Sequence, residues 1–271
     1  MKFKIVSDSA SNLFTLPGVE YCCVPLKIIA PTKEYVDTPD LDLDGMIEDL
    51  KTVKGPTGTS CPNVHEWSEA FEGAEHVFAV TISGNLSGSC SAAMNAAEGR
   101  DNVFVIDSLS AGPGMQLIVE RLRDLILKGL EFEQIQAAIR EYHMHTHIVF
   151  SLESLANLAR NGRVSPAIAK IAGVLGLRLI CIGSKHGTIE PVHKARGEKK
   201  ALRVIFEQMK ANGYHGGRAI ISHCQNLPAA QAMEEIIRQE FPSAAIDINR
   251  CTALCSFYAE QGGLLVGFED L

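Results

Sequence analysis

The sequence lacks the features that mark membrane and nucleic-acid-binding proteins. No stretch approaches the roughly 20 apolar residues needed to cross a bilayer, and Asp8 interrupts the apolar run that follows Met1. Basic residues are fewer than acidic ones, with 25 lysines and arginines against 32 aspartates and glutamates. Broad nucleic-acid binding, by contrast, needs a basic face. We therefore expect no nucleic-acid partner and no stable membrane insertion, and the missing signal-peptide pattern predicts a cytoplasmic location.

Metal-binding spacing is also absent. The eight cysteines include no C-x-x-C pair, since Cys22 and Cys23 are adjacent and Cys251 and Cys255 are four apart. In a chain of 271 residues without a signal peptide, this pattern predicts reduced thiols that are mostly buried. The alternating histidines in residues 143–147 fall where a helix ends and a strand begins, so they do not share one face. We expect no metal site.

Complete catalytic signatures are missing as well. The G-x-S-x-G elbow of serine hydrolases is off by one position in residues 84–88, and the G-x-G-x-x-G dinucleotide motif loses its last glycine in residues 112–117. No P-loop lysine signature is present. These absences predict a protein with no cofactor and no catalytic residue. A hydrolase that uses Ser87 or Cys90 stays open as an alternative.

What the sequence does contain is an alternation of strand-like and helix-like segments. Within residues 1–150 this alternation predicts a parallel sheet covered by helices on both faces. Between apolar runs at 177–182 and 188–193, the polar turn that ends in Gly187 predicts an antiparallel hairpin. We therefore expect an α/β protein of two domains: an α/β/α lobe over residues 1–150 and a mixed or antiparallel α/β lobe over residues 151–271.

Three local patterns give sharper expectations. Asn63 and Glu66 have the spacing of a capping box, which predicts that a helix begins there. Residues 21–29 have the pattern of one strand. Residues 152–158 carry an apolar stripe at helical spacing, which predicts a helix ended by the following Asn-Gly pair.

Two loops rich in hydroxyl groups are the most informative feature of the chain. Residues 59–62 read Thr-Ser-Cys-Pro, and residues 83–89 read Ser-Gly-Asn-Leu-Ser-Gly-Ser after an apolar strand and before a helical stretch. A strand that turns through glycines into a helix presents backbone N–H groups and the positive end of the helix dipole. Neutral hydroxyl donors at that place suit an anionic head group, so the loops predict a site that holds an acid.

Other polar and basic residues lie where they could support such a site. Asp8 and Asp107 close two predicted strands, at the sheet edge where ligands bind in open parallel sheets, although each also suits a helix cap. Arg160 and Arg163 flank a tight turn, and residues 196–200 open a helix with a basic cluster. These clusters suit either an anionic partner or solvated helix ends.

The ordered motifs resemble those of the DegV family of bacterial fatty-acid-binding proteins, which includes the binding subunits of fatty-acid kinase. The similarity runs almost end to end. The motifs that carry it are Ser7-Asp8-Ser9, Thr59-Ser60-Cys61-Pro62-Asn63 against T-S-Q-P-S, Ser83 to Ser89 against S-x-x-L-S-G-T, Asp107-Ser108, Gly112 with Gly114, Leu155 and Leu158 with Arg160-Asn161-Gly162-Arg163, and Arg196-Gly197 with Lys199-Lys200-Ala201.

The resemblance implies a two-domain fold that binds one long-chain fatty acid between its lobes, without catalysis of its own. It also implies a possible partner, a kinase subunit that phosphorylates the bound acid for phospholipid synthesis. A lipid-sensing regulatory protein that signals through residues 196–200 stays open as an alternative. The ligand-binding residues that we expect are Thr59, Ser60, Ser83, Ser87, Gly88, Arg160, Arg196 and Tyr258.

The chain departs from the family pattern in two places. Cys61 and Asn63 replace the usual glutamine and serine. Tyr258 takes the histidine position of the T-H-x-G-P-G segment, and Glu260 takes a glycine position. The hydroxyl loops survive, so these departures bear on the contacts of the head group more than on lipid binding.

Overall fold

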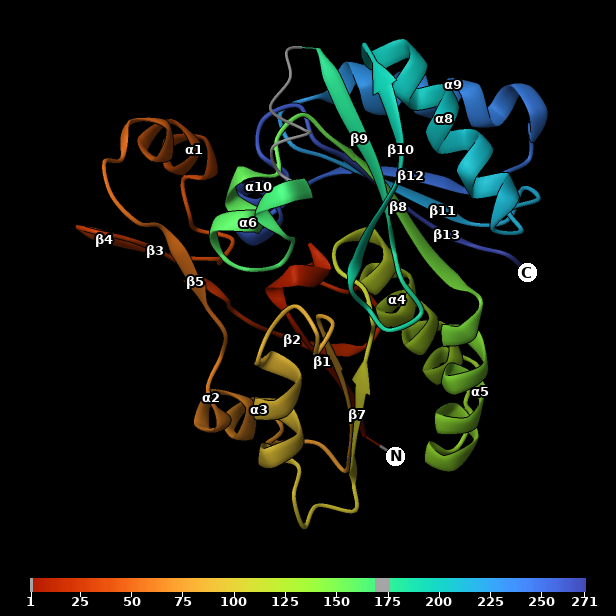
Figure 1. The fold of residues 1–271 in the computed structure, drawn as a ribbon. Helices are drawn as coiled ribbons and strands as arrows, with labels where there is room; N and C mark the ends of the chain where they lie inside the picture. The colour runs from red at the N-terminus through yellow and green to blue at the C-terminus, as the bar shows by residue number, and fades with distance from the viewer. Residues whose placement is uncertain (1, 169–175) are drawn as a thin grey trace.

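The computed structural model describes residues 2–168 and 176–271. Its first half is built around a four-stranded parallel sheet with the order β2-β1-β6-β7 (Figure 1). The strands are β1 (Phe3–Asp8), β2 (Glu20–Val24), β6 (His76–Thr81) and β7 (Val103–Asp107). The parallel sheet predicted from the alternation of elements is therefore confirmed.

Helices cover both faces of this sheet, as expected. On one face, α2 (Val64–Ala70) and α3 (Ser89–Ala96) bury Trp67 and Ala93 against β1 and β6. On the other face lies α4 (Pro113–Leu127). The capping box at the start of α2 is confirmed: Asn63 Oδ1 accepts the amide of Glu66 at 3.0 Å, and Glu66 Oε2 accepts the amide of Asn63 at 2.7 Å.

A six-stranded mixed sheet with the order β10-β9-β8-β13-β11-β12 dominates the second half. Its strands pair antiparallel except for the parallel pair β11–β12, which agrees with the mixed or antiparallel sheet predicted. The strands are β8 (Thr146–Leu152), β9 (Leu177–Gly183), β10 (Ile189–Arg196), β11 (Ala219–His223), β12 (Ile246–Arg250) and β13 (Leu264–Glu269). The predicted boundary at residue 150 falls inside β8, so the division into two lobes stays a prediction.

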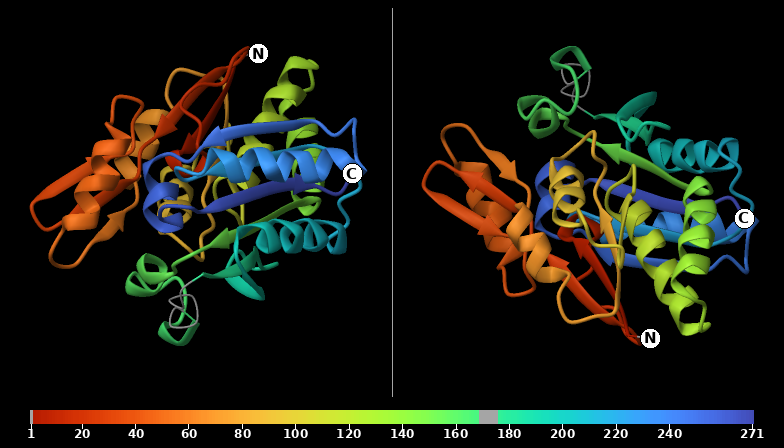
Figure 2. Two further views of the ribbon diagram at one scale, coloured as in Figure 1. Left: turned by 90° about the horizontal axis from the view of Figure 1, so that it is seen from above. Right: turned by 90° about the horizontal axis from the view of Figure 1, so that it is seen from below.

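The predicted hairpin is also confirmed, because β9 and β10 pair across the turn that contains Gly187, whose φ is +72°. The outer face of the six-stranded sheet is covered by α8 (Glu198–Ala211) and α9 (Leu227–Glu240), as Figure 2 shows. None of the helices described has the length and apolar composition of a bilayer-crossing segment.

Helix α4 lies between the two large sheets and joins them. It contacts β1 and β6 on one side and β8, β11 and β13 on the other. Gly267 of β13 makes the close approach possible, since a Cβ there would lie 2.5 Å from the carbonyl carbon of Pro113. Helix α5 (Phe132–Met144) packs beside α4 and leads into β8.

A small three-stranded sheet, β4-β3-β5, projects at the left in Figure 1. Beside it lie α1, α6 and α10, and the short helix η1 follows β1. Their bounds are β3 (Lys27–Ala30), β4 (Lys33–Val36), β5 (Gly58–Ser60), η1 (Ser9–Ser11), α1 (Leu43–Thr52), α6 (Ala156–Arg160) and α10 (Ala253–Ala259).

Two expectations about element boundaries were wrong. Residues 21–29 are not one strand, because the chain breaks at Pro25, which has no N–H to donate, and β2 and β3 belong to different sheets. The apolar stripe at 152–158 is not one helix. Leu152 instead pairs with Leu179 in the sheet, and α6 begins at Ala156.

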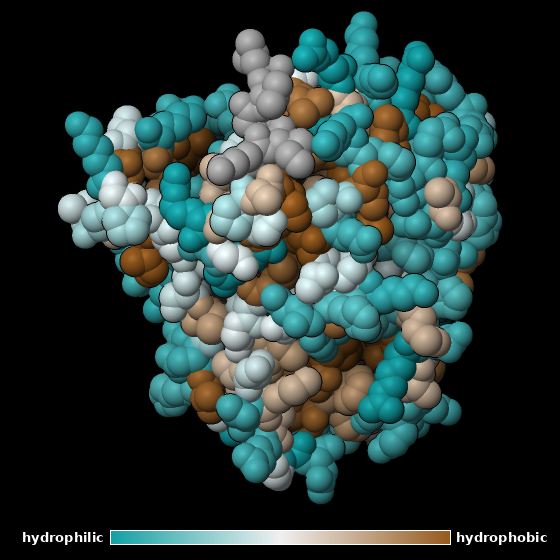
Figure 3. Space-filling view, in the orientation of Figure 1, coloured by the Kyte–Doolittle hydropathy of each residue, from teal (hydrophilic) through white to brown (hydrophobic). Residues whose placement is uncertain are grey.

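The edge strand β7 leaves apolar surface on one face of the molecule. Figure 3 shows hydrophobic residues gathered at the lower centre of this face, over β7, whereas the upper right over α8 is mostly hydrophilic. Arg140 of α5 lies over the ring of Phe104 in β7, with its guanidinium carbon 4.8 Å from the ring centroid. A charged side chain therefore covers part of this edge, which discourages pairing with another strand.

Candidate functional site

A cavity lies between the parallel sheet and the six-stranded sheet. The empty space of the cavity is about 820 Å³ when the solvent at its open mouth is included. Most of its wall is hydrocarbon, contributed by segments far apart in the sequence. The apolar lining residues are Leu26, Ile82, Leu86, Leu109, Ala111, Ile148, Phe150, Leu152, Leu158, Ile189, Leu254, Ala259 and Leu265.

Strand β8 gives the cavity its length. Ile148, Phe150 and Leu152 alternate along the strand and all face the cavity, and the first and last are about 13 Å apart at the usual rise per residue. At the Ile148 end, Gly183 leaves room, since a Cβ there would lie 2.9 Å from Ile148 Cγ2. The cavity is therefore an elongated apolar space along the sheet.

Polar groups also enter the wall, and Tyr258 brings one from α10, which contacts α6 just after the Leu152 end of β8. Thr59 Oγ1 and the Tyr258 hydroxyl lie 2.7 Å apart and share a hydrogen bond. The Arg163 guanidinium carbon is 6.0 Å from the Tyr258 ring centroid, and Arg163 Nε donates to the Leu86 carbonyl at 2.9 Å. Ser87, the residue after Leu86, also lines the cavity. Three hydroxyls and one guanidinium thus converge from four segments.

The loop after β6 is fixed at both of its ends by one buried carboxylate. Asp8 Oδ2 accepts the Ile82 amide at 2.9 Å and the Ser89 hydroxyl at 2.7 Å, while Asp8 Oδ1 accepts the Ala10 amide at 3.2 Å. The last of these bonds caps η1, as predicted for Asp8. Burial raises the pKa of Asp8 to about 7, because the charged form loses its hydration there.

Asp107 does not cap the next helix, so that expectation was wrong. Helix α4 begins only at Pro113. Asp107 Oδ1 instead accepts the amides of Gly84 at 3.1 Å and Leu109 at 3.0 Å. The carboxylate therefore joins the loop after β6 to the loop after β7, and both loops line the cavity.

The β9–β10 hairpin packs over the loop after β6. The Ser83 hydroxyl donates to the Gly187 carbonyl at 2.7 Å, and Asn85 Nδ2 donates to the His186 carbonyl at 2.6 Å. Gly187 has a positive φ, and a Cβ there would lie 2.2 Å from Ser83 Oγ, so a larger residue would push the hairpin away. The predicted hairpin turn thus forms part of the cavity wall.

The predicted site residues divide into two groups. Thr59, Ser87 and Tyr258 line the cavity together. The others lie outside its lining: the Ser83 hydroxyl is buried and used by Gly187, the Ser60 hydroxyl donates to the Cys61 carbonyl, Gly88 is the exposed N-cap of α3, and Arg160 and Arg196 are exposed. The first group therefore forms the core of the candidate site.

That the Arg163 side chain reaches the cavity wall was not predicted from the sequence. Nor was the contribution of Thr188 and Ser110 to that wall. The signal for Arg163 was Gly162, whose φ of +75° turns the chain back after α6. Arg163 then reaches the cavity while Arg160, three residues earlier, stays exposed on α6.

Two histidines outside the cavity share one carboxylate. His145 Nδ1 and His147 Nε2 contact the two oxygens of Asp270 at 2.7 and 2.9 Å, and hydrogen bonding to Asp270 raises the pKa of His145. The cysteines are all free, and most are buried, as predicted. In residues 2–168 and 176–271, no three His, Cys, Asp or Glu side chains are grouped to hold a metal ion.

Asp8 gives a testable pH dependence of stability. Its pKa is raised from 3.8 in the reference state to about 7 in the folded protein, so the folded state binds this proton more tightly. That contribution is present below about pH 4 and is lost as the pH rises through about 7, with a slope of up to about 1.4 kcal/mol per pH unit. Chemical denaturation over this range should show the free energy of unfolding of wild type falling relative to Asp8→Asn. Parallel profiles for the two proteins would contradict the assignment.

Comparison with known proteins agrees with this geometry. A family model described as "Uncharacterised protein, DegV family" matches residues 2–269. A DegV domain-containing protein from Streptococcus pneumoniae is 39% identical over 283 residues, which cover 99% of both chains.

Solved structures with bound ligands also match over the whole length. The Streptococcus pneumoniae Fatty Acid Kinase (Fak) B3 protein loaded with linoleic acid has a TM-score of 0.97 and 39% identity, and the match covers 100% of both chains. A DegV family protein from Eubacterium eligens loaded with heptadecanoic acid has a TM-score of 0.96 and 38% identity, covering 99% of this chain and 100% of that one.

Proposed function

Because the chain belongs to the DegV family, we propose that it binds one long-chain fatty acid with its tail in the cavity between the two large sheets. The observation that carries this proposal is the elongated, mostly apolar cavity in which Thr59, Ser87, Arg163 and Tyr258 bring polar groups to one part of the wall. The fatty acids bound by the Streptococcus and Eubacterium proteins support it.

The carboxylate would lie at this polar part of the wall, near Leu152, and the tail would run toward Ile148. Thr59 and Tyr258 share one hydrogen bond, which uses one of their two O–H groups and leaves the other free to donate to a carboxylate. Ser87 Oγ accepts the Ser89 amide at 3.3 Å, so its own O–H is also free. Donors of this kind favour the ionised acid, and the positive charge of Arg163 nearby adds to the effect.

The tail supplies most of the binding free energy. Each buried methylene contributes on the order of 0.8 kcal/mol, so a long acyl chain provides roughly 10 kcal/mol before the costs of ordering are subtracted. The carboxylate oxygens of the head group then need only hydrogen-bond donors. This balance predicts that chain length matters more to affinity than any single polar contact.

Titration of the lipid-stripped protein by calorimetry tests the proposal. We expect tight binding of linoleic and heptadecanoic acids, much weaker binding of octanoic acid because its tail buries fewer methylenes, and weaker binding of linoleyl alcohol because it lacks the charge. Failure of both long acids to bind would contradict the proposal.

Removing a hydroxyl from the polar part of the wall should weaken binding in a residue-specific way. Ser87→Ala and Tyr258→Phe should each cost about 1–3 kcal/mol, or roughly tenfold to a hundredfold in Kd, because a donor to the carboxylate is lost. The matched control is Ser60→Ala, which removes an exposed hydroxyl outside the cavity. Equal effects of Ser60→Ala and Ser87→Ala would remove Ser87 from the site.

The arrangement favours a carrier over an acyl hydrolase. Among the described residues, no histidine or carboxylate contacts Ser87 Oγ, whose hydrogen-bond partner is the Ser89 amide. Burial raises the pKa of the Cys90 thiol, which disfavours the thiolate that a nucleophile needs. Turnover of an acyl ester that is lost in Ser87→Ala would instead support the hydrolase.

We further propose that the carrier presents its ligand to a fatty-acid kinase subunit. The name of the Fak B3 protein supports this, and residues 196–200 offer an exposed basic surface at the start of α8. Acyl phosphate formation with a kinase subunit and ATP tests the proposal. If the protein binds lipid but a different protein partner at that surface, the sensor alternative holds instead.

A further inference from the structure

Two carboxylates lie buried beneath the polar part of the cavity wall, and neither touches the cavity. Asp8 and Asp37 are 0% and 1% exposed. Among the residues that the structure describes, neither forms an ion pair, and each is held by N–H and O–H donors. A buried carboxylate without a cation costs several kcal/mol unless its hydrogen bonds are well made, so the positions of these donors are informative.

Asp37 holds α10 in the way that Asp8 holds the loop after β6. Its oxygens accept the amides of Ala253 at 2.8 Å and Leu254 at 3.1 Å, together with the Thr252 hydroxyl at 3.1 Å. Thr252 makes no side-chain cap of its own, so a carboxylate from far away in the chain caps this helix. Leu254 and Tyr258 of α10 line the cavity.

The Thr252 hydroxyl also lies close to the backbone that follows Asp8. Thr252 Oγ1 lies 3.1 Å from the Ser9 carbonyl as well as from Asp37 Oδ2, and Ser9 follows Asp8. The backbone amide of Asp37 also donates to the carbonyl of Leu26, another lining residue, at 2.9 Å. Apart from the Ala10 amide, the donors bonded to these carboxylates belong to segments that line the cavity.

We propose that Asp8 and Asp37 are positioning residues of the fatty-acid site: Asp8 fixes residues 82–89, which carry Leu86 and Ser87, and Asp37 fixes α10, which carries Tyr258. The inference rests on the proposed function and deepens it, because it names what sets the distance between the two walls that hold the head group. Burial raises the pKa of both carboxyls, and the titratable groups that face one or both of them include Tyr21, Cys23, Cys90 and Cys255.

The test compares Asp8→Asn and Asp37→Asn with the control Asp124→Asn, whose carboxylate pairs with Arg123 on α4. The asparagine amide has nearly the same size as the carboxylate. Its NH₂ group, however, takes the place of an oxygen that accepted hydrogen bonds from N–H donors. We expect linoleic acid to bind at least about tenfold more weakly to each site variant, since a wall of the site loses its anchor. The control should bind like wild type.

Hydrogen exchange of the same proteins separates a local effect from a general loss of stability. Only a local effect speeds exchange in one segment and leaves the other protected. Asp8→Asn should speed exchange in residues 82–89 and leave 253–259 protected, and Asp37→Asn should do the reverse. If either variant fails to fold, Ser89→Ala and Thr252→Val each remove one donor and leave the carboxylate in place, and the same local pattern is expected with a smaller loss of affinity.

Two results would overturn the inference. One is affinity within about twofold of wild type in both variants, a change too small for a lost anchor. The other is faster exchange spread evenly over the molecule, which would give the carboxylates a role in the fold alone. If wild type itself fails to bind linoleic acid, the proposed function fails instead, so the two failures are distinguishable.

Discussion

Leu265→Trp should abolish the binding of linoleic acid without unfolding the protein. Leu265 lies on β13, pairs with Phe150 and faces the cavity midway between Ile148 and Leu152. An indole there blocks the passage of the tail beyond this point. If about six methylenes lose their site, roughly 5 kcal/mol is lost, which is more than a thousandfold in Kd. Calorimetric titration of the lipid-stripped variant measures it.

The control for this prediction lies on the same strand. Phe268 faces the opposite layer, where it packs against Tyr214 at a centroid distance of 5.6 Å. Phe268→Trp should therefore cost stability, on the order of 1–3 kcal/mol for an overpacked core, and leave lipid binding unchanged. Full binding by Leu265→Trp would show that the tail does not occupy this cavity.

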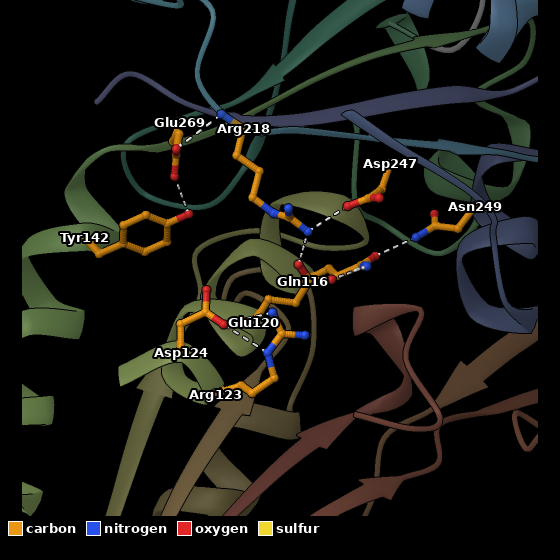
Figure 4. Close-up of polar contacts among 9 residues, drawn as sticks. All are labelled: Gln116, Glu120, Arg123, Asp124, Tyr142, Arg218, Asp247, Asn249 and Glu269. Atoms are coloured by element: carbon orange, nitrogen blue, oxygen red, sulfur yellow. Dashed lines mark hydrogen bonds and ion pairs between the residues drawn. The ribbon is translucent and has the colours of Figure 1, made fainter. Parts of the chain in front are cut away.

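Arg218→Met should be the most destabilising of the polar replacements that leave the ligand site untouched. Arg218 Nη2 contacts Glu120 Oε2 and also lies 2.7 Å from Asp247 Oδ2 (Figure 4). Glu120 is 8% exposed, so losing Arg218 leaves a buried carboxylate whose only donor among the described residues is Gln116, at 2.8 Å. Breaking a buried pair in this way costs about 3 kcal/mol. Chemical denaturation measures the loss.

Two further variants separate the buried pair from the exposed one. Asp247→Asn should cost less than about 1 kcal/mol, because its side chain is 55% exposed and surface pairs are weak. Adding Glu120→Gln to Arg218→Met should recover most of the loss, since the buried charge is then gone. Equal losses in Arg218→Met and Asp247→Asn would contradict this account of how α4 is tied to β11 and β12.

Local chemistry allowed much of this fold to be predicted. The capping box at Asn63, the glycine turn at Gly187 and the alternation of apolar runs depend on near neighbours, and the structure agrees with each. Where a distant partner decides the outcome, the prediction failed or was not made. Asp107 bonds Gly84 instead of capping a helix, and the segments on either side of Pro25 find their strand partners in different sheets.

The candidate site also has features that depend on near neighbours and features that depend on distant partners. The hydroxyl loops were visible in the sequence because their residue types and turns are local. The contact of Thr59 with Tyr258 spans 199 positions, and the bonds from Asp37 to α10 span more than that. No periodicity or spacing encodes such pairs, since they depend on how α4 sets the two large sheets against each other. For the same reason the buried role of Ser83 was not foreseen.

The orientation of the bound acid is the most direct test of the whole account. A crystal structure with a fatty acid brominated at its terminal carbon would locate both ends of the ligand. We expect the bromine beside Ile148 and Gly183, and the carboxylate within hydrogen-bond distance of Ser87 and of Thr59 or Tyr258. A reversed chain, or a ligand bound outside the cavity between the sheets, would contradict it.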